Sequence, residues 1–316
     1  MSGPWLLLGG GLLDPNLQAL AAAADAAGVG LIDLRTPPGH SPLFHWDLDA
    51  PGGVLPWGGT AWPVGAFLRH DVFGPQADPR PAVHERAQGW QAALQGWLLA
   101  HPQVRTCNAD MAPEALYKVA AQVAARQVGL CTPPTWLSND AQALRRRQAL
   151  GPAIAKPVAG GGLCQTLEDA LQAVAPEVPH SAMPALVQPR LVAPELRVFV
   201  IGRHTLAFRV DSPSLDYRAE QDATVTPCEV PPEVQALRRL MQRFRMDFGA
   251  ADFKTDPATG ALCFLELNTS PMFVHFDQVS GGAVTRALLD HLVGHLLEGV
   301  EAPLRGHSGA NPQDRA

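Results

Sequence analysis

The chain has 316 residues, of which 47% are apolar, and its formal net charge is −6 at pH 7. This composition predicts a globular protein of two or three domains and excludes a disordered chain. It also excludes a broad nucleic-acid interface, which would need a basic surface. No apolar stretch has membrane-spanning length, and the N-terminus lacks the basic start and cleavage region of a signal peptide. The five cysteines form no Cys-x-x-Cys pair, so we expect reduced thiols in a cytoplasmic protein without a zinc or disulfide framework.

The first 34 residues predict a β-α-β unit. A strand from Trp5 to Leu8 runs into Gly9-Gly10-Gly11, and an Ala-rich helix from Pro15 to Ala27 leads to a second strand from Val29 to Leu34. This order favours a parallel sheet. The glycines and Asp33 also resemble a dinucleotide fingerprint, which would suit a dinucleotide-dependent oxidoreductase. Because the third glycine of that pattern is absent, we favour a structural turn.

The rest of the first domain shows fewer motifs. Residues 36–81 are rich in Pro, Gly and Trp. A strand from Ala66 to Leu68 would deliver Arg69-His70-Asp71 to a loop, where we expect a surface cluster more than a ligand cleft. An amphipathic helix from His84 to Leu99 and a strand from Val104 to Asn108 complete this part.

The middle of the chain predicts a helix from Met111 to Val128 that contains Lys118. An extended segment from Thr132 to Leu137 follows. Ser138-Asn139-Asp140 then offers N-caps for a short helix that ends near Arg147.

Residues 152–158 predict an apolar strand that carries Lys156 and runs into a glycine-rich segment, namely Gly160, Gly161 and Gly162. Such a loop lets backbone amides approach a phosphate closely, while the lysine supplies charge. It is not a Walker loop, because the lysine precedes the glycines. The alternative is a glycine-rich surface turn.

The C-terminal part alternates strands and helices. We expect three strands, over Ala185–Arg190, Glu195–Val200 and His204–Val210, and then a helix from Pro231 to Phe244. A hairpin and a helix from Gly282 to Leu297 follow, and the polar tail after Pro303 is expected to be disordered.

The hairpin carries three oxygen-bearing side chains. If Asp256 pairs with Leu262 around the turn, Asp252 lies opposite Glu266, and Asn268 shares their face. The opposite face then comprises Phe253, Leu265 and Leu267.

Two carboxylates and an amide oxygen suit Mg²⁺, which keeps water and phosphate oxygens as its other ligands. The alternative is an edge hairpin with solvated acids.

Asp252, Glu266 and Asn268, in this order, resemble the metal-binding end of the ATP-grasp ligases. The segment from Glu266 to Pro271 is similar to the same element in the ribosomal-protein glutamate ligases. Residues from Glu195 to Arg197 and the segment from Leu206 to Ser212 resemble the graspetide (microviridin-type) peptide ligases.

The resemblance covers about Cys107 to Val300. It implies an α/β protein with an ATP-grasp fold, α+β in its C-terminal lobe, behind an N-terminal Rossmann-like pre-ATP-grasp domain. The implied divisions are residues 1–110, a central lobe 111–184, a C-terminal lobe 185–302 and a disordered tail 303–316.

The resemblance also assigns roles to residues. It implies that Lys118, Lys156 and a flexible loop of Gly160, Gly161 and Gly162 contact the nucleotide phosphates. It implies that Gln188 and Leu191 lie at a hinge that holds the adenine and that Glu195 contacts the ribose. Arg197 and Arg218 would lie near the reacting groups, and Asp252, Glu266 and Asn268 would bind magnesium or manganese.

The implied function is an ATP-dependent, ADP-forming carboxylate–amine ligase that makes an amide or ester bond through an acyl phosphate. Its substrate would be a peptide or an amino acid, with neither nucleic acid nor membrane as a partner, and a homodimer is left open. The polar segment from Asp211 to Thr224 favours a peptide, because its charges can pair with an extended ligand. The rivals are a small-molecule ligase, the oxidoreductase and a non-catalytic nucleotide-binding protein.

Overall fold

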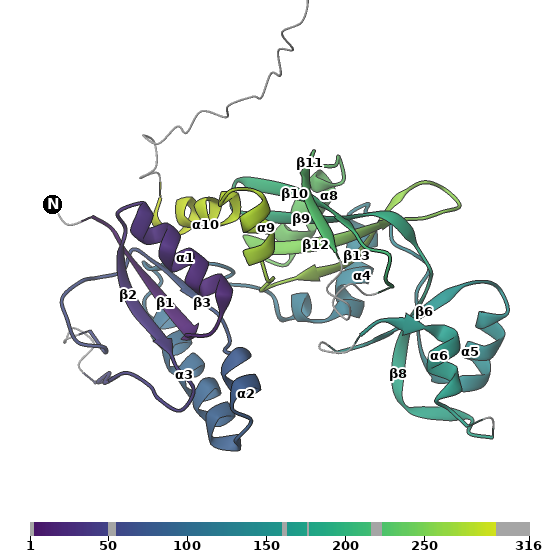
Figure 1. The fold of residues 1–316 in the computed structure, drawn as a ribbon, viewed down its shortest axis with the longest axis horizontal. Helices are drawn as coiled ribbons and strands as arrows, with labels where there is room; N and C mark the ends of the chain where they lie inside the picture. Colours follow the sequence, from purple (N-terminus) through teal and green to yellow (C-terminus); the bar gives the residue numbers. More distant parts are fainter. Residues whose placement is uncertain (1–2, 50–54, 160–162, 176, 216–222, 295–316) are drawn as a thin grey trace, which may run out of the picture.

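The computed structural model describes residues 3–49, 55–159, 163–175, 177–215 and 223–294. Figure 1 shows three parts: an N-terminal sheet with its helices, a small lobe that carries β6 and β8, and between them a larger sheet flanked by α8, α9 and α10. Within the described ranges, no helix combines the length and the apolar character needed to cross a membrane.

The N-terminal sheet is parallel, with strand order β2-β1-β3-β4. Alternation along the first strand directs Leu6 and Leu8 into a core with α1, and Leu7 into a separate core with α3. The parallel sheet predicted from the β-α-β start is therefore confirmed. Its elements are β1 (Trp5–Gly11), α1 (Pro15–Ala26), β2 (Gly30–Thr36), β3 (Gly65–Leu68), α2 (Phe73–Ala77), α3 (Pro81–Ala100) and β4 (Arg105–Thr106).

The glycine run lies within β1 and packs against the chain that follows β3. A Cβ on Gly10 would lie 2.5 Å from the carbonyl oxygen of Arg69, and one on Gly11 would lie 2.1 Å from Oδ1 of Asp71. This close approach accounts for the glycines without a dinucleotide. Arg69 and Asp71 are both buried, so the expectation of a surface cluster is wrong for these two residues, whereas His70 is exposed as expected.

The small lobe is an antiparallel sheet with strand order β5-β8-β6-β7 and two helices. The predicted N-cap of its first helix is confirmed: the Asp140 carboxylate accepts a hydrogen bond from the backbone N–H of Ala143 at 2.8 Å. The elements are β5 (Trp136–Asp140), α5 (Ala141–Gln148), β6 (Ala153–Pro157), β7 (Gln165–Thr166), α6 (Leu167–Gln172) and β8 (His180–Pro189).

The larger sheet is antiparallel, with strand order β11-β10-β9-β12-β13. Its strands and the helices around it are a 3-10 helix η1 (Pro113–Leu116), α4 (Lys118–Gln127), β9 (Val192–Ile201), β10 (His204–Asp211), β11 (Thr224–Cys228), α8 (Val234–Arg243), β12 (Phe248–Thr255), β13 (Leu262–Asn268), α9 (Val274–Val279) and α10 (Ala283–Val293).

The two faces of this sheet differ. Val198 and Ala251 belong to a core with α4 and α8, whereas Phe199 and Ala250 belong to a core shared with α1, α9 and α10. Since side chains alternate along a strand, Arg197 and Asp252 lie on the same face as Phe199 and Ala250. That face is packed at one end of the sheet and borders a cavity at the other.

The predicted helix from Met111 to Val128 is interrupted at Tyr117, whose backbone is extended with φ −108° and ψ 115°. Before the break, Ala112 donates a backbone hydrogen bond to Phe244, so the chain must turn before α4 can pack beside β13. Lys118 is therefore the first residue of α4, where its side chain reaches the end of the sheet, and not a residue in mid-helix.

Candidate active site

Three directly opposite residues form a row across neighbouring strands. Arg197 on β9 pairs with Asp252 on β12, and Asp252 pairs with Glu266 on β13. The predicted position of Asp252 opposite Glu266 is thus confirmed.

The hairpin reaches this register by another route than the predicted one. Thr255, not Asp256, pairs with Leu262, and the register then shifts by one residue next to Asp252. The shift is a β-bulge, which opposes two residues on β13 to one on β12. Because of it, Leu265 lines the cavity beside Glu266, so the prediction that Leu265 points away is wrong.

Helix α4 supports this bulge. Gln122 is buried and donates hydrogen bonds to the carbonyl oxygens of Phe264 and Leu265. A carbonyl freed from the strand ladder thereby keeps a partner.

Basic side chains hold the acidic ones. Arg197 donates to both oxygens of Asp252, with Nε 2.8 Å from Oδ1 and Nη2 3.0 Å from Oδ2. Asn268 donates from Nδ2 to Oδ2 of Asp252 at 3.2 Å, and Lys118 Nζ lies 3.1 Å from Oε2 of Glu266. Burial raises the pKa of Asp252 to about 6, against the opposing charge of Arg197 and with the help of the nearby Glu266 and Glu195.

A second pair lies one step further along the same face. Lys254 on β12 is opposite Glu195 on β9, and its Nζ lies 2.8 Å from Oε2 of Glu195. Lys254 was missed in the sequence, although it follows Asp252 by two positions and so must share its face. From the small lobe, Lys156 on β6 reaches the same cavity, and burial lowers the pKa of its ammonium.

Strand β8 contributes an unpartnered polar atom. Gln188 is buried, donates from Nε2 to Oγ1 of Thr135 at 2.9 Å, and its Oε1 has no hydrogen-bond partner among the described residues. A buried acceptor without a partner is costly, so a ligand that donates a hydrogen bond here would be favoured. Leu191 lies nearby at the wall of the cavity.

The cavity has a volume of about 690 Å³, within the range of small-molecule sites. It lies between the small lobe and the larger sheet, and its wall brings together the predicted site residues that the structure describes: Lys118, Lys156, Gln188, Leu191, Glu195, Arg197, Asp252, Glu266 and Asn268. The predictions for Gly160, Gly161, Gly162 and Arg218, like the tail 303–316, fall outside the described residues. Sequence reasoning missed several residues of the wall, among them Cys164, Arg190, Lys254 and His275.

The oxygen donors fit a magnesium ion. Asp252 and Asn268 are already within hydrogen-bond distance of each other, and Glu266 is opposite Asp252. Two carboxylates and one amide oxygen form a hard donor set of the kind that Mg²⁺ prefers. For the amide oxygen to face the ion, the Asn268 amide must turn over, and its Nδ2 and Oδ1 are interchangeable in shape.

The N-terminal sheet fixes the loop that follows Asn268. Arg69 forms a buried ion pair with Asp14 at 2.7 Å and donates to the carbonyl oxygen of Pro271 at 2.9 Å. Asn16 accepts hydrogen bonds from the backbone N–H groups of Phe273 and Val274. The carboxyl ends of β1 and β3, where a dinucleotide would bind, are thus occupied by the protein's own loop.

No family model matches the chain, and no curated protein matches it. Solved structures do. The ATP-grasp ligase PsnB, complexed with minimal precursor, Mg and ADP, superimposes with a TM-score of 0.69 at 23% identity, over 91% of this chain and 98% of that one. The macrocyclase MdnC from Microcystis aeruginosa MRC, bound with precursor peptide MdnA, superimposes with a TM-score of 0.70 at 18% identity, over 92% of this chain and 100% of that one. An ATP-grasp RimK domain protein from Sphaerobacter thermophilus DSM 20745 superimposes with a TM-score of 0.54 at 17% identity, over 92% of this chain and 100% of that one.

The chain has the ATP-grasp fold. The match extends over nearly the whole length of both chains, so it includes the N-terminal sheet as well as the two lobes that enclose the cavity. The predicted α/β architecture with an ATP-grasp arrangement is confirmed.

Proposed function

We propose that this ATP-grasp protein is an ATP-dependent, ADP-forming ligase that joins a carboxylate to an amine, or to a hydroxyl, of a peptide. The observation that carries the proposal is the row from Arg197 through Asp252 to Glu266 at the wall of a cavity between two lobes. PsnB and MdnC, which share the fold, are described as complexed with precursor peptides, and PsnB also with Mg and ADP.

The chemistry needs an activated carboxylate, because oxide is a poor leaving group. In the proposed reaction, a carboxylate oxygen attacks the γ-phosphorus of ATP, the bond to ADP breaks, and an acyl phosphate forms. The amine then attacks the acyl carbon, loses a proton to water and expels phosphate. Phosphoryl transfer depends chiefly on positioning and on compensation of charge.

The residues of the cavity divide this work. Lys118 and Lys156 would hold nucleotide phosphates, and Glu195 would accept from the ribose, with Lys254 fixing its carboxylate. Mg²⁺ on Asp252, Glu266 and Asn268 would supply compensation of the phosphate charge. Arg197 would then be released from Asp252 to face the acyl phosphate or the substrate carboxylate.

The adenine would lie at the hinge. The unpartnered Oε1 of Gln188 can accept from the exocyclic amino group of adenine, and Leu191 offers an apolar contact. Gly160, Gly161 and Gly162 would close over the phosphates, and Arg218 would face the acyl phosphate or the substrate carboxylate; these roles remain proposals from the sequence. So do the divisions 1–110, 111–184 and 185–302. A cytoplasmic location is proposed as well, in keeping with five free cysteines.

The sequence argument for a peptide from the segment Asp211 to Thr224 is not tested by the structure. Asp211 pairs with the neighbouring Arg209 at 2.8 Å, and Asp216, Arg218 and Glu220 lie outside the described residues. The proposal of a peptide substrate therefore rests on the fold shared with peptide-bound ligases.

Incubation with ATP, Mg²⁺ and peptides encoded beside the gene tests the proposal by mass spectrometry. The expected product has lost one water per bond, with matching ADP release, and Asp252→Asn abolishes both. ADP release with a free amino acid, while every peptide keeps its mass, would replace the peptide with a small-molecule substrate. Nucleotide binding without any turnover would favour the non-catalytic alternative.

A further inference from the structure

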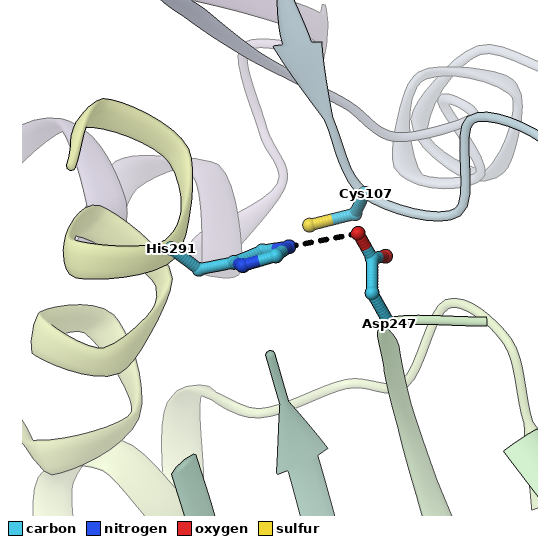
Figure 2. Close-up of side chains that lie close together, drawn as sticks. All are labelled: Cys107, Asp247 and His291. Atoms are coloured by element: carbon cyan, nitrogen blue, oxygen red, sulfur yellow. Dashed lines mark hydrogen bonds and ion pairs between the residues drawn. The ribbon is translucent and has the colours of Figure 1, made fainter. Parts of the chain in front are cut away.

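Three side chains with different donor atoms meet where the N-terminal sheet joins the larger sheet (Figure 2). Cys107 follows β4, Asp247 immediately precedes β12, and His291 lies on α10. One donor atom from each lies within 4.8 Å of the other two. None of the three lines the cavity of the candidate active site.

The donor set differs in kind from that of the magnesium site. A thiolate sulfur, an imidazole nitrogen and a carboxylate oxygen are the ligands of zinc, which accepts three protein ligands and leaves its fourth tetrahedral position to water. Thiolate favours such a cation over Mg²⁺, which prefers oxygen donors. The spacing of the cysteines gave no sign of it, because the three residues come from separate parts of the chain.

The surrounding chain holds these donors in place. Asp247 accepts from the backbone N–H of Asn108 through Oδ1 at 2.6 Å, and its own N–H donates to Oδ1 of Asn108 at 3.0 Å. Gly202 lets the His291 ring lie close, since a Cβ there would be 2.5 Å from Nδ1. Partners of this kind orient ligands before a metal binds.

The geometry also suits a cation. His291 Nε2 lies 2.9 Å from Oδ2 of Asp247, so one donor pair is already in contact. A divalent cation would compensate both a thiolate and a carboxylate at this half-buried junction.

We propose that Cys107, Asp247 and His291 bind one thiophilic divalent cation of the Zn²⁺ class, with a water molecule as the fourth ligand. On binding, the thiol of Cys107 releases its proton to the buffer. The imidazole keeps a single proton on Nδ1, and the lone pair of Nε2 binds the cation in place of the hydrogen bond to Asp247. No electrons are transferred. The cation would fasten the segment after β4 to β12 and α10.

The test uses the full chain with Cys131 and Cys263 both replaced by Ser, because their sulfur atoms lie 2.9 Å apart and could bind Zn²⁺ themselves. Excess Mg²⁺ is added to occupy the proposed magnesium site at Asp252, Glu266 and Asn268. Zn²⁺ titration should show one equivalent bound, with release of protons. Cys107→Ser and His291→Gln should each weaken binding by at least about 10- to 100-fold, the loss that removal of a ligand's supporting partner alone causes. Cys228→Ser is the matched control and should bind normally.

Co²⁺ gives an independent readout, because ligation by a thiolate produces a charge-transfer band that does not depend on stability. The band should appear in the parent chain and be absent from Cys107→Ser, while circular dichroism confirms that both are folded. Zn²⁺ binding that Cys107→Ser leaves unchanged, or a folded parent chain without the cobalt band, would overturn the proposal. The three side chains would then be a hydrogen-bonded His–Asp pair beside a half-buried thiol.

Discussion

Arg197 on β9 donates two hydrogen bonds, of 2.8 and 3.0 Å, to the carboxylate of Asp252 on the adjacent strand β12. Arg197 also makes a cation–π contact, with its Cζ 5.3 Å from the centroid of the Phe276 ring. The same carboxylate is a proposed magnesium ligand. In that proposal the ion would compete with Arg197 for Asp252, and a released guanidinium would lie at the wall of the same cavity.

Arg197→Gln should lower the rate of ligation by about 10²- to 10³-fold, because a preorganised donor to the developing charge is lost. Nucleotide binding, measured by calorimetry, should change far less. Arg209→Gln is the matched control, since Arg209 forms an exposed pair with Asp211 on β10 and should keep nearly full activity. Equal losses in the two variants would contradict a role for Arg197 in the reaction.

Part of this site could be predicted from the sequence, because alternation along β13 brings Glu266 and Asn268 to one face, whereas Asp252 comes opposite Glu266 only through the bulge. The bulge could not, since it depends on Gln122 of α4, a contact between segments far apart in the chain. The burial of Arg69 also escaped prediction, because its partner Asp14 and the loop it holds come from two other segments. Local patterns specify faces and caps, whereas these features arise only when separate elements pack.

Metal affinity should depend on pH through Asp252, whose pKa is raised to about 6 by burial, chiefly, and by neighbouring acids. Below that pH the carboxyl is protonated and Mn²⁺ must displace a proton, so binding should weaken as the pH falls from 7.5 to 5. Calorimetric Mn²⁺ titrations across this range measure the effect. Asn268→Ala should weaken binding at every pH and leave the fold intact, since a half-buried amide contributes little to the core. Affinity that stays constant down to pH 5 would refute the assignment of Asp252.

The same shift affects stability, with a defined sign. A carboxyl whose folded-state pKa exceeds its ordinary value of 3.8 stabilises the fold below that value, and this contribution is lost as the pH rises to about 6. Without metal, the melting temperature of Asp252→Asn should therefore fall less with rising pH over this interval than that of the parent chain. Thermal unfolding followed by circular dichroism checks this. Identical slopes would mean that Asp252 is not the group responsible.

Gln188→Met should raise the KM for ATP by about 10-fold, the equivalent of one hydrogen bond, with little change in kcat or in the KM for peptide. The reason is that the unpartnered Oε1 of Gln188 is the acceptor proposed for adenine. Gln172→Met, at the exposed end of α6, is the matched control. A fall in kcat with an unchanged KM for ATP would place Gln188 outside the nucleotide site.

Cys131 and Cys263 should form a disulfide on mild oxidation. Their sulfur atoms are 2.9 Å apart, and the backbone N–H of Phe264 donates to the carbonyl oxygen of Cys131, so the two segments are already aligned. Cys131 is exposed and would react first with a small disulfide such as oxidised glutathione. Cys263 would then displace glutathione, so that the protein loses two hydrogen atoms and the reagent is reduced.

We expect this cross-link to affect catalysis, because two connections join the small lobe to the rest of the chain. Cys131 lies in the first connection, between α4 and β5, and the second connection runs from β8 to β9. Fixing one of these two connections to β13 should hinder closure of the lobes, so the oxidised chain should ligate more slowly and recover with reductant. Cys131→Ser should be insensitive, and Cys263→Ser should retain bound glutathione in its mass spectrum. Complete cross-linking without any change in turnover would show that closure of the lobes does not require the connection at Cys131 to move relative to β13.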